Sequence, residues 1–235
     1  MKLEIIELTK KYGDKEVLKD ISFTFEEGKI YGLLGRNGAG KTTFFNALNK
    51  DISINEGRFY LDDEFGRNKL QTSDIGYVLS TPIVPEFLTG REFLKFYLDI
   101  NKDKIKDLKD IDYYFDLVQL SKDDQNLLLK EYSHGMKNKI QILINIISNP
   151  KIILLDEPLT SLDIVVQEEM KKILKSLKEN HIIILSTHIL ELATDLCDEI
   201  VVLSNKNLEL IPKANLNSKK YKDKIIKALK EDKND

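Results

Sequence analysis

The sequence has a single cysteine, no long apolar run and only a small imbalance of charge. Because Cys197 has no second cysteine to pair with, an internal disulfide is excluded and a reducing compartment, the cytoplasm, is favoured. Apolar runs such as residues 182–187 are far shorter than the roughly 18 to 20 residues that a membrane span needs. We therefore do not expect the chain to cross a membrane by itself.

Other absences narrow the function further. The formal net charge of -3 argues against a general nucleic-acid binder, although residues 219–233 are locally basic and predict a solvated amphipathic helix. Histidines and cysteines do not cluster with the spacing of a metal site. The N-terminal stretch 1–8 alternates charged and apolar residues, which is not the pattern of a secretory signal.

The overall composition is typical of a soluble globular protein, with 42% hydrophobic and 32% charged residues in a chain of 235. A chain of this length can bury a sizeable core and predicts one large domain or one domain with an inserted lobe.

The spacing of apolar residues changes twice along the chain. Alternating segments up to about residue 80 predict strands, at 3–8, 17–28, 29–35, 54–62 and 74–80. Residues 89–148 switch to the three- and four-residue spacing of helices. Continuous apolar runs then return and predict parallel strands buried on both faces, at 151–156, 181–187 and 199–204. We interpret the chain as a wound α/β core that is interrupted by an all-helical insertion.

A glycine-rich segment, GRNGAGKT at 35–42, fits the pattern G-x-x-x-x-G-K-[ST] between an apolar strand and a helix expected from about Lys41 to Lys50. Small residues let backbone N–H groups converge on a polyphosphate, Lys41 neutralises its β- and γ-phosphates, and the Thr42 hydroxyl can bind Mg²⁺. The alternative is a glycine-rich turn without a ligand. The predicted phosphate-binding residues are Gly35, Asn37, Gly38, Ala39, Gly40, Lys41, Thr42 and Thr43.

A phosphate site of this kind needs a second carboxylate, and the run IILLDEP supplies two candidates. Asp156 ends a predicted buried strand, where its carboxylate can hold Mg²⁺ or its water. Glu157 follows and can accept a proton from an attacking water. The alternative is a strand that simply ends in a polar turn.

The P-loop, the helical insertion, YSHGM, IILLDEP, TSLD and STH follow one another in an order that resembles the nucleotide-binding domain of ATP-binding cassette (ABC) ATPases. The resemblance runs from about Leu3 to Ser204. It implies an α/β P-loop NTPase with a RecA-like core, an N-terminal antiparallel β subdomain and an inserted α-helical subdomain. It predicts a single domain over 1–235, with the core and β subdomain at 1–80 and 150–210, the helical subdomain at 81–149 and a C-terminal tail at 211–235.

The resemblance also implies roles for residues beyond the P-loop. Tyr12 matches the aromatic that stacks on adenine. Ser133 and Gly135 match the signature segment, which faces the γ-phosphate bound by the other protomer. Asp163 matches the D-loop at the dimer seam. His188 matches the switch histidine, which contacts the γ-phosphate and helps orient the water. The predicted catalytic residues are Glu157, His188 and Lys41. The remaining histidines, at 134 and 181, have no predicted role.

Two positions depart from the family pattern. Ser80 stands where the family has a glutamine, and its side chain is shorter and has no amide carbonyl to offer a metal or its water. Our hypothesis is slower or more loosely coupled hydrolysis than in relatives; an unchanged ATPase rate in Ser80→Gln would count against it. Met136 replaces the final glutamine of the signature, and the run that follows resembles the branch that exports drugs and bacteriocins.

The resemblance therefore predicts a Mg²⁺-dependent ATPase that dimerises around two MgATP and drives export through a membrane permease on another chain. The partner cassette is expected to be an identical copy, with a different cassette as the alternative. Nucleic acid is not an expected partner, and the expected location is the cytoplasmic face of the membrane. Residues 80–89 and the helices after them are where we expect the permease to dock. The alternatives are a soluble ABC ATPase that acts on ribosomes or DNA, and a nucleotide-gated regulatory subunit.

Overall fold

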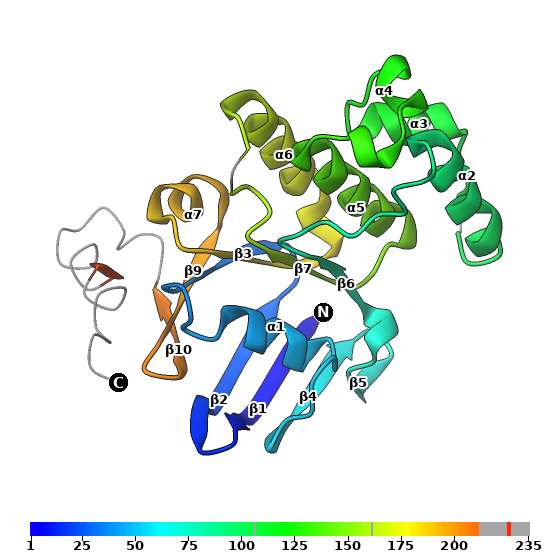
Figure 1. Cartoon of the computed structure of the whole chain (residues 1–235). Helices are drawn as coiled ribbons and strands as arrows, with labels where there is room; N and C mark the ends of the chain where they lie inside the picture. Colours follow the sequence, from blue (N-terminus) through cyan, green and yellow to red (C-terminus); the bar gives the residue numbers. More distant parts are fainter. Residues whose placement is uncertain (106, 161, 212–224, 227–235) are drawn as a thin grey trace.

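The chain folds around two β-sheets with helix α1 (Lys41–Leu48) held between them (Figure 1). The computed structural model describes residues 1–105, 107–160, 162–211 and 225–226. The expected tail at 211–235 and the amphipathic helix at 219–233 therefore lie almost wholly outside the described residues.

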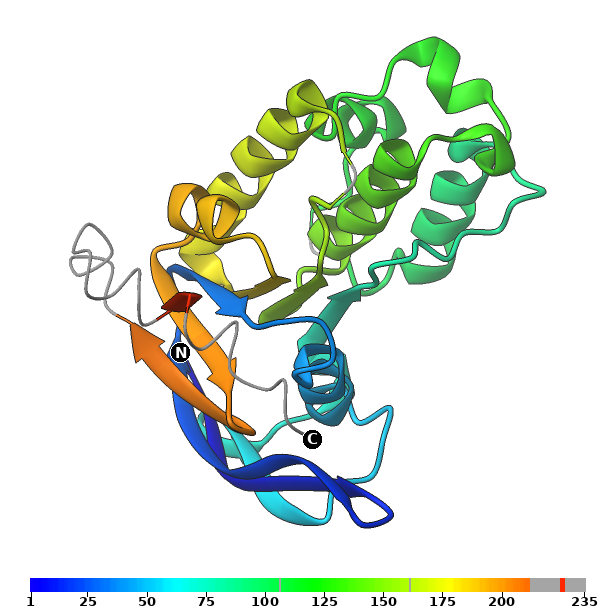
Figure 2. The ribbon, with the colours of Figure 1, turned by 60° about the vertical axis from the view of Figure 1, so that its left-hand side comes forward.

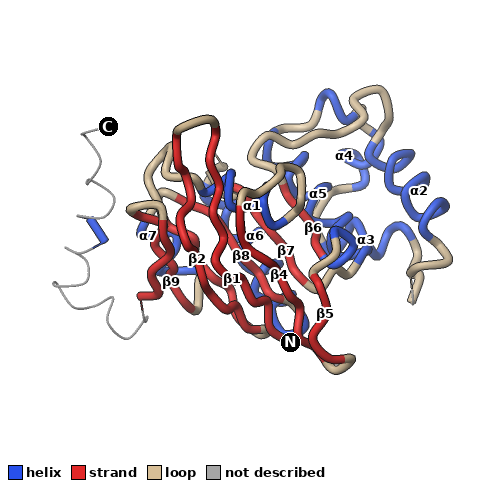
Figure 3. Tube along the Cα trace, turned by 90° about the horizontal axis from the view of Figure 1, so that it is seen from below, coloured by secondary structure: helices blue, strands red, loops and turns tan. Residues whose placement is uncertain are grey.

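The first sheet is antiparallel and has the strand order β2-β1-β4-β5. Figure 3, a view from below, shows β1, β2 and β4 running side by side. Its strands are β1 (Lys2–Tyr12), β2 (Lys15–Glu26), β4 (Glu56–Asp63) and β5 (Gly66–Lys69). Strand β5 lies in the polar connection between two predicted strands, and its four exposed residues leave no apolar pattern to detect.

The second sheet has the order β10-β9-β3-β8-β7-β6, and every pairing except β10 with β9 is parallel. Its strands are β3 (Lys29–Leu34), β6 (Ile75–Val78), β7 (Ile152–Asp156), β8 (Ile182–Thr187), β9 (Glu199–Ser204) and β10 (Asn207–Ile211). The buried parallel strands were predicted; β10 was not, because only its last residue is buried. Strand β10 also places Ile211, the first residue of the predicted tail, in the sheet.

The predicted helical insertion lies between β6 and β7. It holds α2 (Gly90–Asn101), α3 (Ile111–Leu117), α4 (Lys122–Asn126) and α5 (His134–Ser148). Figure 2 shows α2, α3 and α4 grouped away from the antiparallel sheet. Helices α6 (Ile164–Leu177) and α7 (Leu190–Leu196) belong to the core. Several helices are capped at their N-termini by side chains. At the start of α2, for example, Thr89 Oγ1 accepts from Glu92 N, and Glu92 Oε2 accepts from Thr89 N.

The parallel sheet is covered on both faces, and alternate residues of one strand serve different clusters. In β7, Ile153 and Leu155 pack with α5, α6 and α7, whereas Ile152 and Leu154 pack with α1 and the antiparallel sheet. Within the described part of the chain, no helix is both long and apolar enough to span a bilayer.

A short antiparallel β-bridge between Thr89 and Leu128 connects the loop before α2 to the segment that leads into α5. Leu129 N donates to Leu88 O at 2.8 Å, and Gly90 N donates to Leu127 O at 3.2 Å. Tyr132 follows Leu129 by three residues and is 5% exposed. A Cβ atom added to Gly90 would lie 2.0 Å from the Tyr132 hydroxyl. The position of the Tyr132 side chain therefore leaves room for glycine alone at position 90.

The Tyr132 hydroxyl is buried and has no hydrogen-bond partner among the described residues. We expect Tyr132→Phe to be neutral or to stabilise the fold by up to about 1 kcal/mol, because it removes an unsatisfied buried group. Gly90→Ala should destabilise the fold, and adding Tyr132→Phe should recover part of the loss. Urea denaturation of the single and double variants measures both effects. A loss of more than about 1 kcal/mol in Tyr132→Phe alone would show that the hydroxyl makes a stabilising hydrogen bond, contrary to our interpretation.

His181 has a structural position at the start of β8. It is 5% exposed, and its Nδ1 lies 2.6 Å from Pro150 O. Burial lowers the pKa of His181 below its ordinary value, and the hydrogen bond with Pro150 opposes that shift only in part. The folded state therefore favours the neutral imidazole.

A pH dependence of stability follows from this lowered pKa. The stabilisation by neutral His181 is present above the unfolded-state pKa, about 6.5, and is lost as the pH falls through the lower pKa of the folded state. We expect the free energy of unfolding to decline less below about pH 6.5 in His181→Asn, which keeps a donor near Pro150, than in the natural chain. Denaturation curves at several pH values give the free energy of unfolding. If it falls equally steeply with decreasing pH in the two proteins, neutral His181 does not supply this stabilisation.

Candidate active site

The P-loop joins the carboxyl end of β3 to the first residue of α1. Gly38 and Gly40 have φ angles of 83° and 106°, in the region that favours glycine. Gly40 is also close to β2, because a Cβ there would lie 2.9 Å from Val17 Cγ1. Gly40 caps α1 without a side-chain hydrogen bond, so the first N–H groups of the helix point into the loop and can bind an anion.

The Lys41 side chain folds back along this loop and is 6% exposed. Its Nζ donates to Gly35 O at 2.8 Å and to Arg36 O at 3.2 Å, and it lies 3.4 Å from Glu157 Oε1. The ammonium is thus fixed above the P-loop, where a bound phosphate would meet it.

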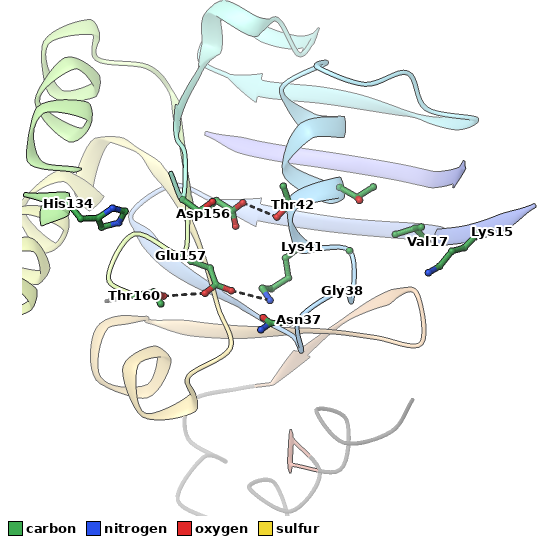
Figure 4. A pocket seen from close by; sticks show the side chains of 13 residues that line it. Lys15, Val17, Asn37, Gly38, Lys41, Thr42, His134, Asp156, Glu157 and Thr160 are labelled. Atoms are coloured by element: carbon green, nitrogen blue, oxygen red, sulfur yellow. Dashed lines mark hydrogen bonds and ion pairs between the residues drawn. The ribbon is translucent and has the colours of Figure 1, made fainter. Parts of the chain in front are cut away.

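Thr42 and Asp156 meet across the gap between α1 and β7, as Figure 4 shows. Thr42 Oγ1 donates to Asp156 Oδ2 at 2.8 Å, and Ser186 Oγ donates to Asp156 Oδ1 at 2.6 Å. A hydroxyl and a carboxylate are the hard oxygen donors that Mg²⁺ prefers, and a triphosphate and water can supply the remaining ligands. The pair therefore fits the predicted metal position.

Glu157 adopts φ 49°, an uncommon conformation for a residue other than glycine, and its N–H donates to Ser186 Oγ at 3.0 Å. Its Oε2 lies 2.9 Å from His188 Nδ1 and accepts from Thr160 Oγ1 at 3.2 Å. Burial raises the pKa of Glu157, but the hydrogen bond with His188 and the charge of Lys41 outweigh it and hold this pKa below its ordinary value. The carboxylate is therefore ionised at neutral pH.

A pocket of about 760 Å³ joins these groups. Its walls come from β2, the P-loop, α1, the loop after β6, the start of α5 and the loop after β7 (Figure 4). It is lined by Lys15, Val17, Asn37, Gly38, Gly40, Lys41, Thr42, Thr43, Ser80, His134, Asp156, Glu157 and Thr160. Most of the predicted phosphate-binding, metal and catalytic residues thus share one pocket.

The other predicted P-loop residues and His188 lie beside this pocket. Gly35 supplies a carbonyl to Lys41. Ala39 lines a neighbouring hollow on the far side of the P-loop. His188 reaches the pocket through its contact with Glu157.

Four other residues with predicted roles, Tyr12, Ser133, Gly135 and Asp163, do not line this pocket. Tyr12 is 49% exposed at the end of β1, with Lys10 Nζ 4.5 Å from its ring centre. Ser133 caps α5 by accepting from Met136 N, and Asp163 caps α6 by accepting from Val166 N. Gly135 packs against α6.

The structure also adds residues that the sequence analysis missed. Ser186 bonds to both Asp156 and Glu157 because β8 pairs with β7 in the register that sets Ser186 beside Asp156. Thr160 follows Glu157 closely and could have been suspected from that spacing. His134, which had no predicted role, lines the pocket.

Comparisons with known proteins agree with this geometry. A family model described as ABC transporter matches residues 18–160. An ABC transporter ATP-binding protein of Methanocaldococcus jannaschii is 36% identical over 204 residues, which are 86% of this chain and 74% of that protein.

Two solved structures share the fold. An ATP-binding subunit of an ABC transporter has a TM-score of 0.79 at 22% identity, covering 98% of this chain and all of that one (100%). A dimeric ATP-binding cassette in a post-hydrolysis state, bound to ADP and phosphate, has a TM-score of 0.73 at 23% identity, covering 88% and 96%. The chain belongs to the ABC transporter family, as an ATP-binding subunit with ATPase activity.

Proposed function

We propose that this chain hydrolyses MgATP as one half of a head-to-tail dimer and drives export through a permease on another chain. The observation that carries the proposal is the position of Glu157. Its carboxylate is ionised, is held by His188 and Thr160, and lies 3.4 Å from Lys41 at the wall of the pocket.

Binding of the triphosphate rests on the P-loop. The N–H groups at the start of α1 and the ammonium of Lys41 would contact the β- and γ-phosphates of a bound triphosphate. Thr42 and Asp156 would hold Mg²⁺, which neutralises phosphate charge when it is bound.

Hydrolysis needs a base that stays ionised beside a phosphate, and Glu157 meets this requirement. Its lowered pKa keeps it able to accept a proton from water at neutral pH. The contacts with His188 and Thr160 restrict the carboxylate to one orientation, which favours a single line of attack on the γ-phosphate.

The dimer is supported by the residues that lie outside the pocket of their own chain. Ser133 and Gly135 stand at the start of α5, and Asp163 stands at the start of α6. In the proposed head-to-tail arrangement they meet the nucleotide of the second copy. The dimeric structural neighbour with ADP and phosphate is consistent with this arrangement.

We place permease docking at residues 80–89 and the adjoining face of α2 and α5. A hollow of about 260 Å³ lies there, lined mainly by apolar residues of β6, α2, α5 and this loop. Ile83 and Phe87 are 75% and 79% exposed. Apolar side chains at such exposure favour a protein contact, which would hold the chain at the cytoplasmic face of the membrane.

Affinity purification of the tagged chain from detergent-solubilised membranes tests the transporter assignment. A polytopic protein that co-purifies at a fixed ratio supports it, and co-purification with ribosomes alone contradicts it. An ATPase assay with Lys41→Ala as control tests the enzymatic part separately. Activity that survives Lys41→Ala would come from a contaminant or another site.

A further inference from the structure

A buried lysine lies against the ring of Tyr12 at the end of β1. Lys10 is 7% exposed, and its Nζ lies over the Tyr12 ring at 4.5 Å from the ring centre. A cation within about 6 Å of an aromatic ring centre is attracted by the negative face of the ring, and more strongly where water is excluded. Lys10 therefore restricts the orientation of the Tyr12 ring.

The ammonium of Lys10 is itself held by the segment that connects α1 to β4. Its Nζ donates to Ser53 O at 2.7 Å. Two further bonds join this segment to the same end of β1: Asn55 N donates to Thr9 O at 3.0 Å, and Asn55 Oδ1 accepts from Lys11 N at 2.7 Å. Because the segment follows directly from the P-loop helix, the position of Lys10 is fixed relative to that helix.

Tyr12 lies next to the β2 wall of the nucleotide pocket. It pairs with Lys15 across the turn between β1 and β2, and Lys15 and Val17 line the pocket. Figure 4 shows these two residues on one side of the P-loop, with Asp156 and Glu157 on the other. A nucleotide whose terminal phosphate meets the two carboxylates would extend its nucleoside along β2 toward Tyr12.

The Tyr12 ring has the properties of a stacking partner for a base. It is 49% exposed, so part of its surface stays open although Lys10 lies over one face. An aromatic ring stacks on the face of a base without reading its hydrogen-bonding groups. A ring that is already held in one orientation loses less conformational freedom when the base binds.

We propose that Lys10 positions Tyr12 for the base of the bound nucleotide, with the ammonium over one face of the ring and the base stacked on the other. The inference rests on the proposed function and goes beyond it, because it assigns part of the nucleotide affinity to a residue that does not touch the nucleotide. Lys10 is thus a positioning residue that acts through Tyr12.

Two ligands separate the base from the phosphates. Titration calorimetry with Mg²⁺ gives Kd values for ADP, which has no γ-phosphate to hydrolyse, and for tripolyphosphate, which has no base. We expect Lys10→Met, which keeps the length of the side chain, to weaken ADP binding about fivefold and to leave tripolyphosphate binding within about twofold. Lys10→Arg, which keeps the cation and a donor for Ser53 O, should restore most of the ADP affinity.

A double-mutant cycle tests whether Lys10 acts through Tyr12. Tyr12→Ala should weaken ADP binding about tenfold, and adding Lys10→Met to it should cause no further loss. Lys2→Met provides a matched control on the same strand, because Lys2 is 54% exposed and pairs with Glu26. It should change neither Kd.

Other outcomes overturn the proposal. Equal losses for ADP and tripolyphosphate in Lys10→Met would indicate a purely structural role, and an unchanged Kd for ADP would show that the contact with Tyr12 contributes nothing. A further loss when Lys10→Met is added to Tyr12→Ala would show that Lys10 acts by another route. If the natural chain binds neither ligand, the proposed function fails first, and the role of Lys10 fails with it.

Discussion

Glu157→Gln should reduce the ATPase rate at least about a hundredfold while ATP binding is retained. Glutamine keeps the shape of the side chain and can still accept from Thr160, but it cannot take a proton from water. The P-loop and the Thr42–Asp156 pair remain in place. With hydrolysis blocked, the ATP-bound dimer should accumulate.

Phosphate release measures the rate, and size-exclusion chromatography with MgATP measures the dimer. Glu168→Gln provides a matched control, because Glu168 is 57% exposed and pairs with Lys171 on α6. A fall of less than about tenfold would remove Glu157 as the general base. A variant that stays monomeric with MgATP would contradict the dimer that we propose.

Gly57→Ala should destabilise the fold by about 3 kcal/mol or more. Gly57 lies in β4 with φ 113°, where a side chain is strained. An added Cβ would lie 2.7 Å from Leu8 Cα and 2.9 Å from Ile6 O. These are backbone atoms of β1, at the point where its register with β4 shifts, so neither strand can yield without losing hydrogen bonds.

A second glycine in the same sheet provides the control for Gly57→Ala. Gly66 has φ 96° but open space around its Cβ position, so Gly66→Ala should cost only the backbone strain, about 1 kcal/mol. Urea denaturation followed by circular dichroism gives both values. Equal losses in the two variants would show that the close approach of the strands contributes nothing.

Local patterns were enough to predict the elements that carry the neighbouring residues of the candidate site. The sequence predicted a strand, a glycine-rich turn and a helix that begins at Lys41. In the structure β3, this turn and α1 follow one another in that order. The buried strand that ends at Asp156 follows from its continuous apolar run.

The remaining features depend on contacts between distant segments. Ser186 reaches Asp156 through the pairing of β7 with β8, and a sequence does not state the register of two strands separated by a helix. The strand order of the central sheet also places β3 between β8 and β9, which is not the order of the chain. For His134, the helix was predicted, but its place on the pocket wall depends on how the helical insertion packs against the core.

Helix α1 lies between the two sheets, and this position has a consequence for how the nucleotide site is formed during folding. Eight residues are too few for a stable helix in isolation. Its Phe44 ring lies 6.3 Å from Phe25 of β2, and its Phe45 ring lies 5.9 Å from Tyr77 of β6, so each sheet contributes one partner. The amides of α1 that are hydrogen-bonded within the helix should exchange hydrogen only when the whole domain unfolds, at the slow rate of the central strands. An N-terminal fragment that ends before β6 should therefore contain the whole P-loop sequence and still bind no ATP.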